Sequence, residues 1–249
     1  MHSRTRRQLS TGHEVDLPLE LSFAMGGVIV PARRRRLASV LPEGVVPLAI
    51  APGVSPVTLV GIGYRRVGRP SADGPEEPGE ATGLEPYDEF AVIVPAVTGD
   101  SIVGGFAGDV GGYVHWLPVT TEASVALGRE LWGYPKEVAD VTVTDGPNGI
   151  RTVLEVDGER VLRLDVPRGR RREREWTMQS YTTKDGTLLR TRVEIEGPVA
   201  LRSGIGVSLE WGQSEVADDL RQLGIRGLPL ARLYGSRVGA RLFDGEPVR

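Results

Sequence analysis

The sequence contains no cysteine and only three histidines, and both shortages limit the chemistry that the chain can support. Without cysteine there can be no disulfide, no thiolate ligand for a metal and no cysteine nucleophile. His2 and His13 lie in a polar N-terminal segment that we expect to be flexible, which leaves His115 as the remaining histidine. We therefore expect neither a metal site nor a Ser-His-Asp triad.

Long apolar runs are also missing, and the charges nearly balance. No run approaches about 18 apolar residues, and no apolar segment follows the first arginines, so we expect neither a membrane helix nor a secretory signal. A formal net charge of −3 gives no reason to expect nucleic acid or a membrane surface as a partner. The run at 168–175 mixes both signs without aromatic residues between them, which indicates a solvated edge. The sequence thus predicts a soluble, cytoplasmic protein.

Glycine and proline, in contrast, are frequent, with 33 and 18 residues, and many short segments alternate between apolar and polar side chains. Hairpin-like segments follow one another at 141–166, and nothing repeats the strand-helix-strand pattern of parallel sheets. We predict a mainly β fold, an antiparallel barrel or sandwich with a few short helices. Residues 1–16 are expected to be a flexible arm and residues 17–249 a single domain.

Two further segments lack regular periodicity. Residues 69–86 are rich in proline, glycine and glutamate, and we expect a long surface loop that could act as a lid. Residues 99–112 contain paired glycines but no strand-to-helix frame, so we expect turns and bulges there and no dinucleotide site. We predict no cofactor.

The most regular stretch of the chain leads to Lys136. Apolar residues recur there with the spacing of a helix, Thr121 can cap its start, and Gly133 can end it in a left-handed conformation. Pro135 then fixes a backbone dihedral directly before the lysine. The pattern predicts a helix of about three turns and a strand at 138–144, with Lys136 held rigidly where the strand begins.

The scarcity of lysine makes this position unusual. The chain has 30 lysines and arginines together, but Lys136 and Lys184 are its only lysines. Arginine cannot serve as an amine nucleophile, so a position that keeps lysine is a candidate for covalent chemistry. The alternative is a lysine whose stem packs on Trp132 or Tyr134 and whose ammonium is in water. Lys184 lies in a predicted turn, where we expect it to be solvated.

The residues around Lys136 form a longer motif. Residues 128–138 read GRELWGYPKEV, and Tyr87 and Glu89 form a Tyr-x-Glu pair upstream. These motifs resemble the signature of the acetoacetate decarboxylase family, and the similarity extends over about residues 87–145. The resemblance implies a closed, cone-like barrel whose interior holds Lys136, and a Schiff base between this lysine and a ketone.

Such chemistry requires the neutral amine. The pKa of Lys136 would have to fall from about 10.4 towards 7, at roughly 1.36 kcal/mol per unit. We expect burial to supply most of this shift. The residues expected to surround the lysine and its substrate are Tyr134, Trp132, Phe90, Leu117 and Tyr87.

Two carboxylates are close to the lysine in the sequence or in the motif. Glu137 stands where the resemblance implies a second lysine, but neighbouring residues on a strand face opposite sides, so we expect little coupling. Glu89 beside an iminium could transfer protons, and the alternative is a carboxylate that is exposed or paired with Arg129. We expect Arg129 and Glu130 to hold the lysine segment in place.

The resemblance is incomplete at two positions. The arginine that it implies on an N-terminal strand falls near Ser22 and Phe23, and the strand at 57–64 holds no glutamate. We therefore keep three functions open. The first is decarboxylation of a small 3-oxo acid through a Schiff base on Lys136, and the second is an aldol or dehydration reaction on a pyruvate-like substrate. The third is non-covalent binding or cyclisation of an apolar metabolite in the barrel.

The C-terminal third contains more large apolar residues than one amphipathic helix, predicted at 214–225, needs to close a barrel end. Large exposed apolar patches are unusual on monomers, and the resembled family forms closed assemblies. We predict a homo-oligomer whose interface includes the C-terminal helix region and can also include the N-terminal arm. The apolar residues concerned are Trp211, Leu220, Leu223, Ile225, Leu228, Leu230, Leu233, Tyr234, Val238 and Leu242.

Overall fold

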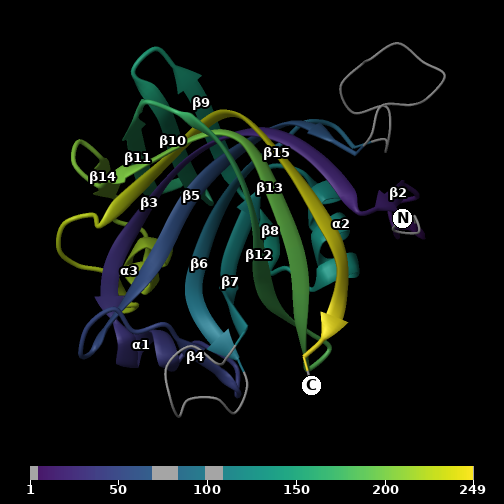
Figure 1. Cartoon of the computed structure of the whole chain (residues 1–249), viewed down its shortest axis with the longest axis horizontal. Coiled ribbons are helices and arrows are strands. Elements are labelled where there is room, and N and C mark those ends of the chain that lie inside the picture. The colour runs from purple at the N-terminus through teal and green to yellow at the C-terminus, as the bar shows by residue number, and fades with distance from the viewer. Residues whose placement is uncertain (1–4, 69–83, 99–108, 249) are drawn as a thin grey trace.

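The computed structural model describes residues 5–68, 84–98 and 109–248. Over these residues the chain forms a closed barrel with a smaller sheet packed on its outside (Figure 1). The barrel strands pair in the order β6 (Asp88–Thr98), β5 (Val54–Val67), β3 (Leu19–Arg33), β15 (Ala231–Pro247), β13 (Thr187–Ser203), β12 (Arg172–Lys184) and β7 (Asp109–Val119), and β7 pairs with β6 to close the ring. The predicted mainly β barrel is confirmed.

The ring is antiparallel except at one joint, where β12 runs parallel to β7. The short strand β8 (Lys136–Val138) also runs parallel to β7, next to the end of that strand. β4 (Val45–Pro47) pairs with β6 and extends the sheet beyond the ring. β8 is therefore attached to the barrel wall, and its first residue is Lys136.

The second sheet covers one outer face of the barrel. Its strands lie in the order β14 (Ser208–Trp211), β11 (Glu159–Pro167), β10 (Gly149–Val156) and β9 (Asp140–Gly146). Glycines on the barrel strands permit this close packing, because a Cβ at Gly61 would come 1.9 Å from Oγ1 of Thr152. The apolar contacts between the two sheets, covered by α3 (Glu215–Gln222), form what we call the outer core.

A second apolar cluster, the inner core, fills the barrel. It contains buried residues from β3, β5, β6, β7, β13 and β15, and it is covered by α2 (Glu122–Trp132). Because side chains alternate along a strand, β3 sends Phe23 into the inner core and Ala24 into the outer core. A strand residue therefore reaches the barrel interior only if its side chain belongs to the inner core.

The ends of α2 are those that the sequence predicts. The side chain of Thr121 accepts a hydrogen bond from the N–H of Ser124, and Gly133 ends the helix with φ of +64°. Such an N-cap stabilises a helix by about 1 kcal/mol, and the left-handed conformation favours glycine. The other helices in the described parts of the chain are α1 (Arg34–Ala38) and α3, whose start is capped by Ser214 as predicted.

Two sequence-based expectations need correction. Within the predicted flexible arm at 1–16, the described residues from Thr5 onward form a hairpin of β1 (Thr5–Gln8) and β2 (Glu14–Leu17), and Leu9 is buried in the inner core. The strand predicted at 138–144 is split at Ala139, which still donates to the carbonyl of Val119 on the barrel, whereas β9 from Asp140 onward joins the second sheet.

Most of the predicted loop at 69–86 and of the glycine-rich segment at 99–112 lies outside the described residues. Within the described ranges, no helix is long and apolar enough to cross a membrane.

Candidate active site

Lys136 is fixed through its backbone at the start of β8. Its N–H donates to the carbonyl of Tyr134 over 2.7 Å, and its own carbonyl accepts a hydrogen bond of 2.6 Å from Nε of Arg129. Leu117 of β7 stands opposite Lys136 in the strand pairing. Arg129 thus ties the helix to the strand, which is the anchoring role that the sequence predicts for it.

The side chain of Lys136 is buried against Glu89 and Tyr87. Its Nζ lies 2.7 Å from Oε2 of Glu89 and 3.1 Å from the hydroxyl oxygen of Tyr87, and 4.8 Å from the centre of that ring. The Lys136 and Glu89 side chains are each 5% exposed, so water hardly screens this ion pair. The structure therefore brings together three of the predicted site residues, and Glu89 pairs with the lysine rather than with Arg129.

Tyr64, which the sequence does not single out, completes the cluster. Its hydroxyl donates to Oε1 of Glu89 over 3.1 Å, and its ring centre lies 4.5 Å from that of Tyr87 and 5.5 Å from that of Phe23. Glu89 is thus held on one oxygen by an ammonium and on the other by a phenol. The hydrogen bond from Tyr64 is charge-assisted, a kind about twice as strong as a neutral one, whereas the contact with Lys136 is an ion pair without a hydrogen bond to Oε2.

The electrostatics of the cluster differ from the sequence-based expectation. Burial alone lowers the pKa of Lys136, but the Glu89 carboxylate and Tyr87 raise it, and the net pKa lies above the usual 10.5. Burial raises the pKa of Tyr87 to about 12 and that of Tyr64 well above 10. The expected lowering of the lysine pKa is therefore wrong for this arrangement, in which Lys136 is an ammonium and both phenols remain protonated.

Comparison with known proteins places this geometry in a family. Residues 25–248 match the family described as acetoacetate decarboxylase. The chain belongs to the acetoacetate decarboxylase family. Acetoacetate decarboxylase 1 of Bradyrhizobium diazoefficiens is 38% identical over 60 residues, which are 24% of this chain and 21% of that protein. Acetoacetate decarboxylase 3 of Mesorhizobium japonicum is 36% identical over 61 residues, again 24% and 21% of the two chains. The matched segment thus spans about a fifth of these relatives.

Solved structures share the acetoacetate decarboxylase fold over most of the chain. One, from structural studies of acetoacetate decarboxylase, has a TM-score of 0.64 at 15% identity and covers 93% of this chain and 89% of its own. Another, the enduracididine biosynthesis enzyme MppR complexed with the condensation product of pyruvate and imidazole 4-carboxaldehyde, has a TM-score of 0.64 at 17% identity, with 92% and 88% covered. At these identities the likeness shows the fold alone.

Three other predicted residues lie in the inner core of this family member. Trp132 and Tyr134 have ring centres 5.7 Å apart, and Leu117 is buried with them. The Tyr134 hydroxyl hydrogen-bonds to Oγ of Ser180 over 2.8 Å, and burial raises its pKa to about 12. All three side chains are buried, and their predicted contact with the substrate stays a prediction.

Phe90 does not join them. It is fully buried, but in the outer core, because it follows Glu89 on β6 and adjacent strand residues face opposite sides. The same alternation separates Glu137 from the lysine, since Glu137 is exposed and accepts a hydrogen bond from the indole of Trp116. Phe90 is therefore a core residue and not part of the site.

Lys184 has a different environment from the one that the sequence predicts. It is half-buried, and its ammonium donates to the carbonyl of Glu130 in the last turn of α2. This is a favourable place for a cation, because the carbonyl end of a helix carries partial negative charge. Lys184 thus helps to hold the helix that precedes Lys136.

Neither a metal centre nor a second cation is found beside the ion pair in the part of the chain that the structure describes. No group of three or more histidine, aspartate or glutamate side chains there could hold a metal ion. Near the position where the resemblance implies an arginine, Phe23 packs against Tyr64. The described contacts of Glu89 and Tyr87 involve a single cation, Lys136.

Proposed function

We propose that the chain is a lyase that forms a Schiff base between Lys136 and a small oxo acid, with decarboxylation of a 3-oxo acid as its reaction. The supporting observation is the dry contact of 2.7 Å between Nζ of Lys136 and Oε2 of Glu89. Family membership supports the same chemistry. A cytoplasmic location and assembly into a homo-oligomer belong to this proposal as predictions from the sequence.

The contact between the two side chains provides a route to the neutral amine. The ion pair and the neutral pair of amine and carboxylic acid contain the same number of protons, so one proton can move from Nζ to Oε2 without exchange with solvent. The raised pKa of Lys136 opposes loss of the proton to water. Burial, however, disfavours both charges of the pair and so favours transfer within it. A substrate carboxylate adds negative charge nearby and makes Glu89 easier to protonate.

The reaction then proceeds around Lys136 and Glu89. The amine adds to the ketone carbon, Glu89 returns its proton to the leaving hydroxyl, and loss of water gives an iminium. The carbon–carbon bond to the carboxylate breaks, carbon dioxide leaves, and the bonding electrons move into the iminium to form an enamine. Glu89, reprotonated from solvent, protonates the enamine carbon, and water then hydrolyses the new iminium to release the ketone. One proton is consumed for each carbon dioxide released.

An aldol or dehydration reaction on a pyruvate-like substrate is the second candidate. It would use the same iminium as an electron sink but keep the carboxylate. The structure of MppR, which shares this fold, is described with a condensation product of pyruvate. Product analysis separates the two reactions.

Substrate-dependent inactivation by borohydride tests the proposal. The purified protein is incubated with acetoacetate, or with pyruvate and an aldehyde, and carbon dioxide, acetone and condensation products are measured before and after borohydride is added. We expect irreversible inactivation of the wild type and of Lys184→Ala. Lys136→Ala and Lys136→Arg should have no activity to lose, although the arginine keeps the cation.

A different outcome would favour the non-covalent alternative. If the protein binds an oxo acid or an apolar metabolite with no borohydride-dependent change, and Lys136→Arg behaves like the wild type, the barrel is a binding or cyclising site without an iminium.

A further inference from the structure

A second site candidate lies outside the barrel, in a cavity of about 840 Å³ between the barrel and the second sheet. Its lining comes from segments that are distant in the sequence, namely β5, β9, β13, β15 and the connection from β11 to β12. The residues that line it are Arg65, Asp145, Arg168, Gly169, Arg170, Arg171, Pro198, Ser236 and Arg237. Five arginines and one carboxylate thus surround one hollow in a chain whose net charge is −3.

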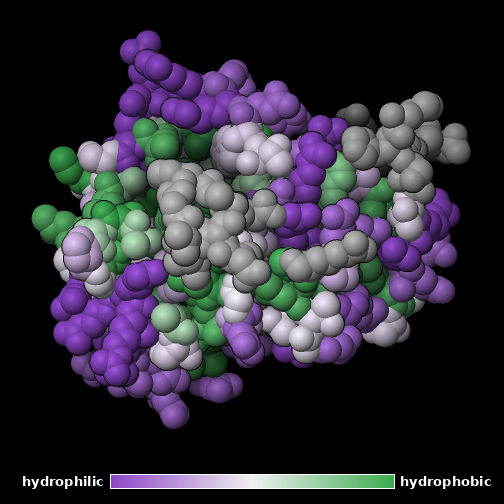
Figure 2. Space-filling model, turned by 60° about the horizontal axis from the view of Figure 1, so that its bottom comes forward, coloured by the Kyte–Doolittle hydropathy of each residue, from purple (hydrophilic) through white to green (hydrophobic). Residues whose placement is uncertain are grey.

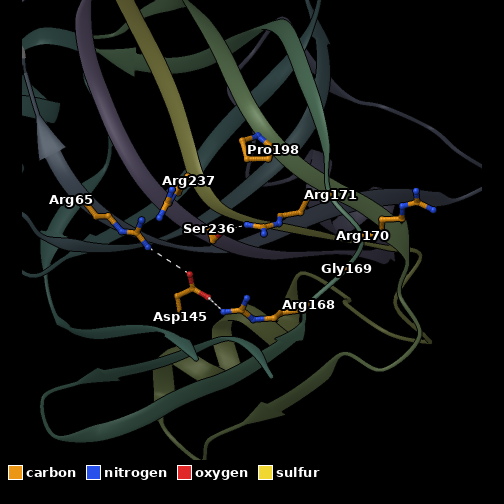
Figure 3. A pocket seen from close by; sticks show the side chains of 9 residues that line it. All are labelled: Arg65, Asp145, Arg168, Gly169, Arg170, Arg171, Pro198, Ser236 and Arg237. Carbon is orange, nitrogen blue, oxygen red and sulfur yellow. Dashed lines mark hydrogen bonds and ion pairs between the residues drawn. The ribbon is translucent and has the colours of Figure 1, made fainter. Parts of the chain in front are cut away.

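Four of the arginines point towards a common space. Figure 3 shows Arg65 of β5, Arg237 of β15, and Arg168 and Arg171 of the β11–β12 connection pointing towards one another, whereas Arg170 points away. With Asp145 among them, four guanidinium groups face one carboxylate, so three positive charges are left without a compensating charge in the cavity. Arginine side chains this close repel one another, and an anion between them would relieve that repulsion.

Existing contacts hold some of these arginines in position and leave others available. Asp145 accepts from Arg168 over 3.3 Å and pairs with Arg65 over 3.6 Å. Arg171 donates to the hydroxyl of Ser236, which is 8% exposed. The structure shows no hydrogen bond or ion pair of the Arg237 side chain with another described residue, although Arg237 also lines an adjoining hollow with Glu173, Glu175 and Glu196. The cavity therefore has a fixed frame and unused guanidinium donors.

The backbone at the cavity is irregular in a way that orients these side chains. The pairing of β3 with β5 shifts register between Ser22 and Phe23, which leaves Arg65 in a bulge. The pairing of β15 shifts between Gly235 and Val238, so Arg237 lies in a second bulge. Bulges redirect side chains and are frequent beside functional sites.

A close approach of the chain also builds the cavity wall. A Cβ at Gly169 would come 2.9 Å from Cβ of Ala200, so glycine lets the arginine-rich connection lie against β13. Residues 168–171 line the cavity, yet Arg168, Arg170 and Arg171 are exposed, as are residues 172–175 on β12, so the predicted solvated edge also forms one side of the cavity.

We propose that this cavity, which we call the arginine pocket, binds a small phosphorylated molecule with two adjacent phosphoryl groups. Guanidinium groups match phosphate oxygens with paired hydrogen bonds, and several of them together favour a multiply charged ligand. One phosphoryl group carries about two negative charges at neutral pH, so a diphosphate balances three positive charges better than a single phosphate does. The inference is independent of the chemistry at Lys136.

Equilibrium binding of pyrophosphate, orthophosphate and citrate at low ionic strength tests the proposal. We expect pyrophosphate to bind at least about tenfold more tightly than either of the others, and to bind more weakly as salt is added. The variant Arg171→Gln/Arg237→Gln should weaken pyrophosphate binding by at least about tenfold. The matched control Arg35→Gln/Arg36→Gln removes the same charge from exposed positions of α1 and should bind as the wild type does.

Several results would overturn the proposal. One is that both double variants bind pyrophosphate equally well. Another is that citrate binds as tightly as pyrophosphate. A third is that the wild type, at normal thermal stability, does not bind pyrophosphate at millimolar concentration. A changed assembly mass in the pocket variant without any effect on anion binding would also overturn it, because the arginines would then serve a protein contact. Arg237→Gln alone should still weaken binding if the double variant fails to fold.

Discussion

Gly128 of α2 lies directly against the side chain of Lys136. A Cβ added at Gly128 would come 2.5 Å from Cδ and 2.7 Å from Cε of the lysine. The helix that precedes the lysine in the sequence thus also packs directly against the methylene stem of its side chain. Glycine at this position leaves the methylene stem extended towards Glu89, and any larger residue has to move it.

Replacement of Gly128 by alanine tests this relationship. The added methyl group should displace Nζ from Glu89 and Tyr87, and a displacement of about 1 Å can cost about a hundredfold in rate. Alanine also favours a helix by about 1 kcal/mol over glycine, so the loss of activity should not be matched by a loss of helix stability. Turnover and thermal unfolding measured on the same preparation check this.

Gly158→Ala is the control for that variant. Gly158 has φ of +77° and no atoms of other residues near its Cβ position, in a turn of the second sheet. It should lower the unfolding temperature and leave turnover unchanged. If Gly128→Ala keeps wild-type turnover, the packing of the lysine stem does not matter for the reaction.

Glu89→Gln should change both the pKa of Lys136 and the rate. In the wild type the carboxylate raises the lysine pKa above 10.5 against the effect of burial. Without that charge only the lowering effect of burial and the smaller effect of Tyr87 remain, so the amine should react with a small amine reagent at lower pH. Loss of the proton acceptor should reduce turnover by about 10²- to 10⁴-fold.

Tyr64→Phe provides the comparison for Glu89→Gln. It removes one hydrogen bond of 3.1 Å from Glu89 but leaves the carboxylate charge in place. The pH at which Lys136 is half modified should stay close to the wild-type value, with a loss of turnover of about tenfold. An unchanged pH midpoint in Glu89→Gln would show that Glu89 does not hold the proton of Lys136.

The site could be predicted from the sequence only where local signals decide the structure. Thr121 and Gly133 mark the ends of a helix through their own side chain and backbone preferences, so the placement of Lys136 followed from them. Tyr64 was hidden because its strand is apolar on both faces and because the bulge at Arg65 interrupts the alternation. Phe90 could have been assigned correctly, since the alternation that separates Glu137 from Lys136 also separates Phe90 from Glu89.

The arginine pocket had no signal in the sequence. Arg65, Asp145 and Arg237 are separated by about 80 residues or more, and only the packing of the second sheet on the barrel brings them together. The residues 168–171 were visible as a charged run, but their partners were not. Long-range packing of this kind cannot be deduced from local propensity.

The stability of the protein should fall below pH 6.5 because of His115. Burial lowers the pKa of this histidine from 6.5, so the unfolded chain binds a proton in a range where the folded chain does not. The contribution of His115 to the free energy of unfolding is therefore fully present above pH 6.5. It is lost as the pH falls from 6.5 towards the pKa of His115 in the folded state. Thermal unfolding between pH 5 and pH 7.5, about the range in which histidine titrates, should show a steeper loss for the wild type than for His115→Gln.

Asp88 changes the pH dependence of stability in the opposite direction, but it does not affect the comparison between the wild type and His115→Gln. Burial raises its pKa from 3.8 despite a hydrogen bond from the N–H of Val143, and this effect is common to the wild type and the His115 variant. Parallel curves for the two proteins would contradict the prediction, because another group would then be responsible for the pH dependence.

The structure reduces the surface that could form the predicted homo-oligomer interface to a few exposed apolar residues. Of the apolar residues predicted for the interface, Leu220, Leu223, Tyr234 and Val238 are buried within the chain itself, whereas Leu228 and Leu230 are exposed. Ile205, which is not among the predicted residues, is also exposed. Figure 2 shows hydrophobic surface among polar residues on the face that it presents. Exposed apolar patches of this kind favour association.

Light scattering during size exclusion should therefore give a multiple of 26.9 kDa for the wild type. Ile205→Ser/Leu228→Ser should give a smaller mass, and the control Ile50→Ser, at another exposed apolar position, should not. A wild-type mass equal to that of one chain would refute the prediction.

The central claim is that Lys136 forms the covalent intermediate, and mass spectrometry of the borohydride-trapped protein after digestion tests it most directly. With acetoacetate as substrate, we predict an isopropyl group on the peptide that contains Lys136, because carbon dioxide leaves before the iminium is reduced. The same peptide from Glu89→Gln should carry less of this group. An adduct on the peptide that contains Lys184, or no adduct from acetoacetate or pyruvate on any peptide of an active preparation, would contradict the claim.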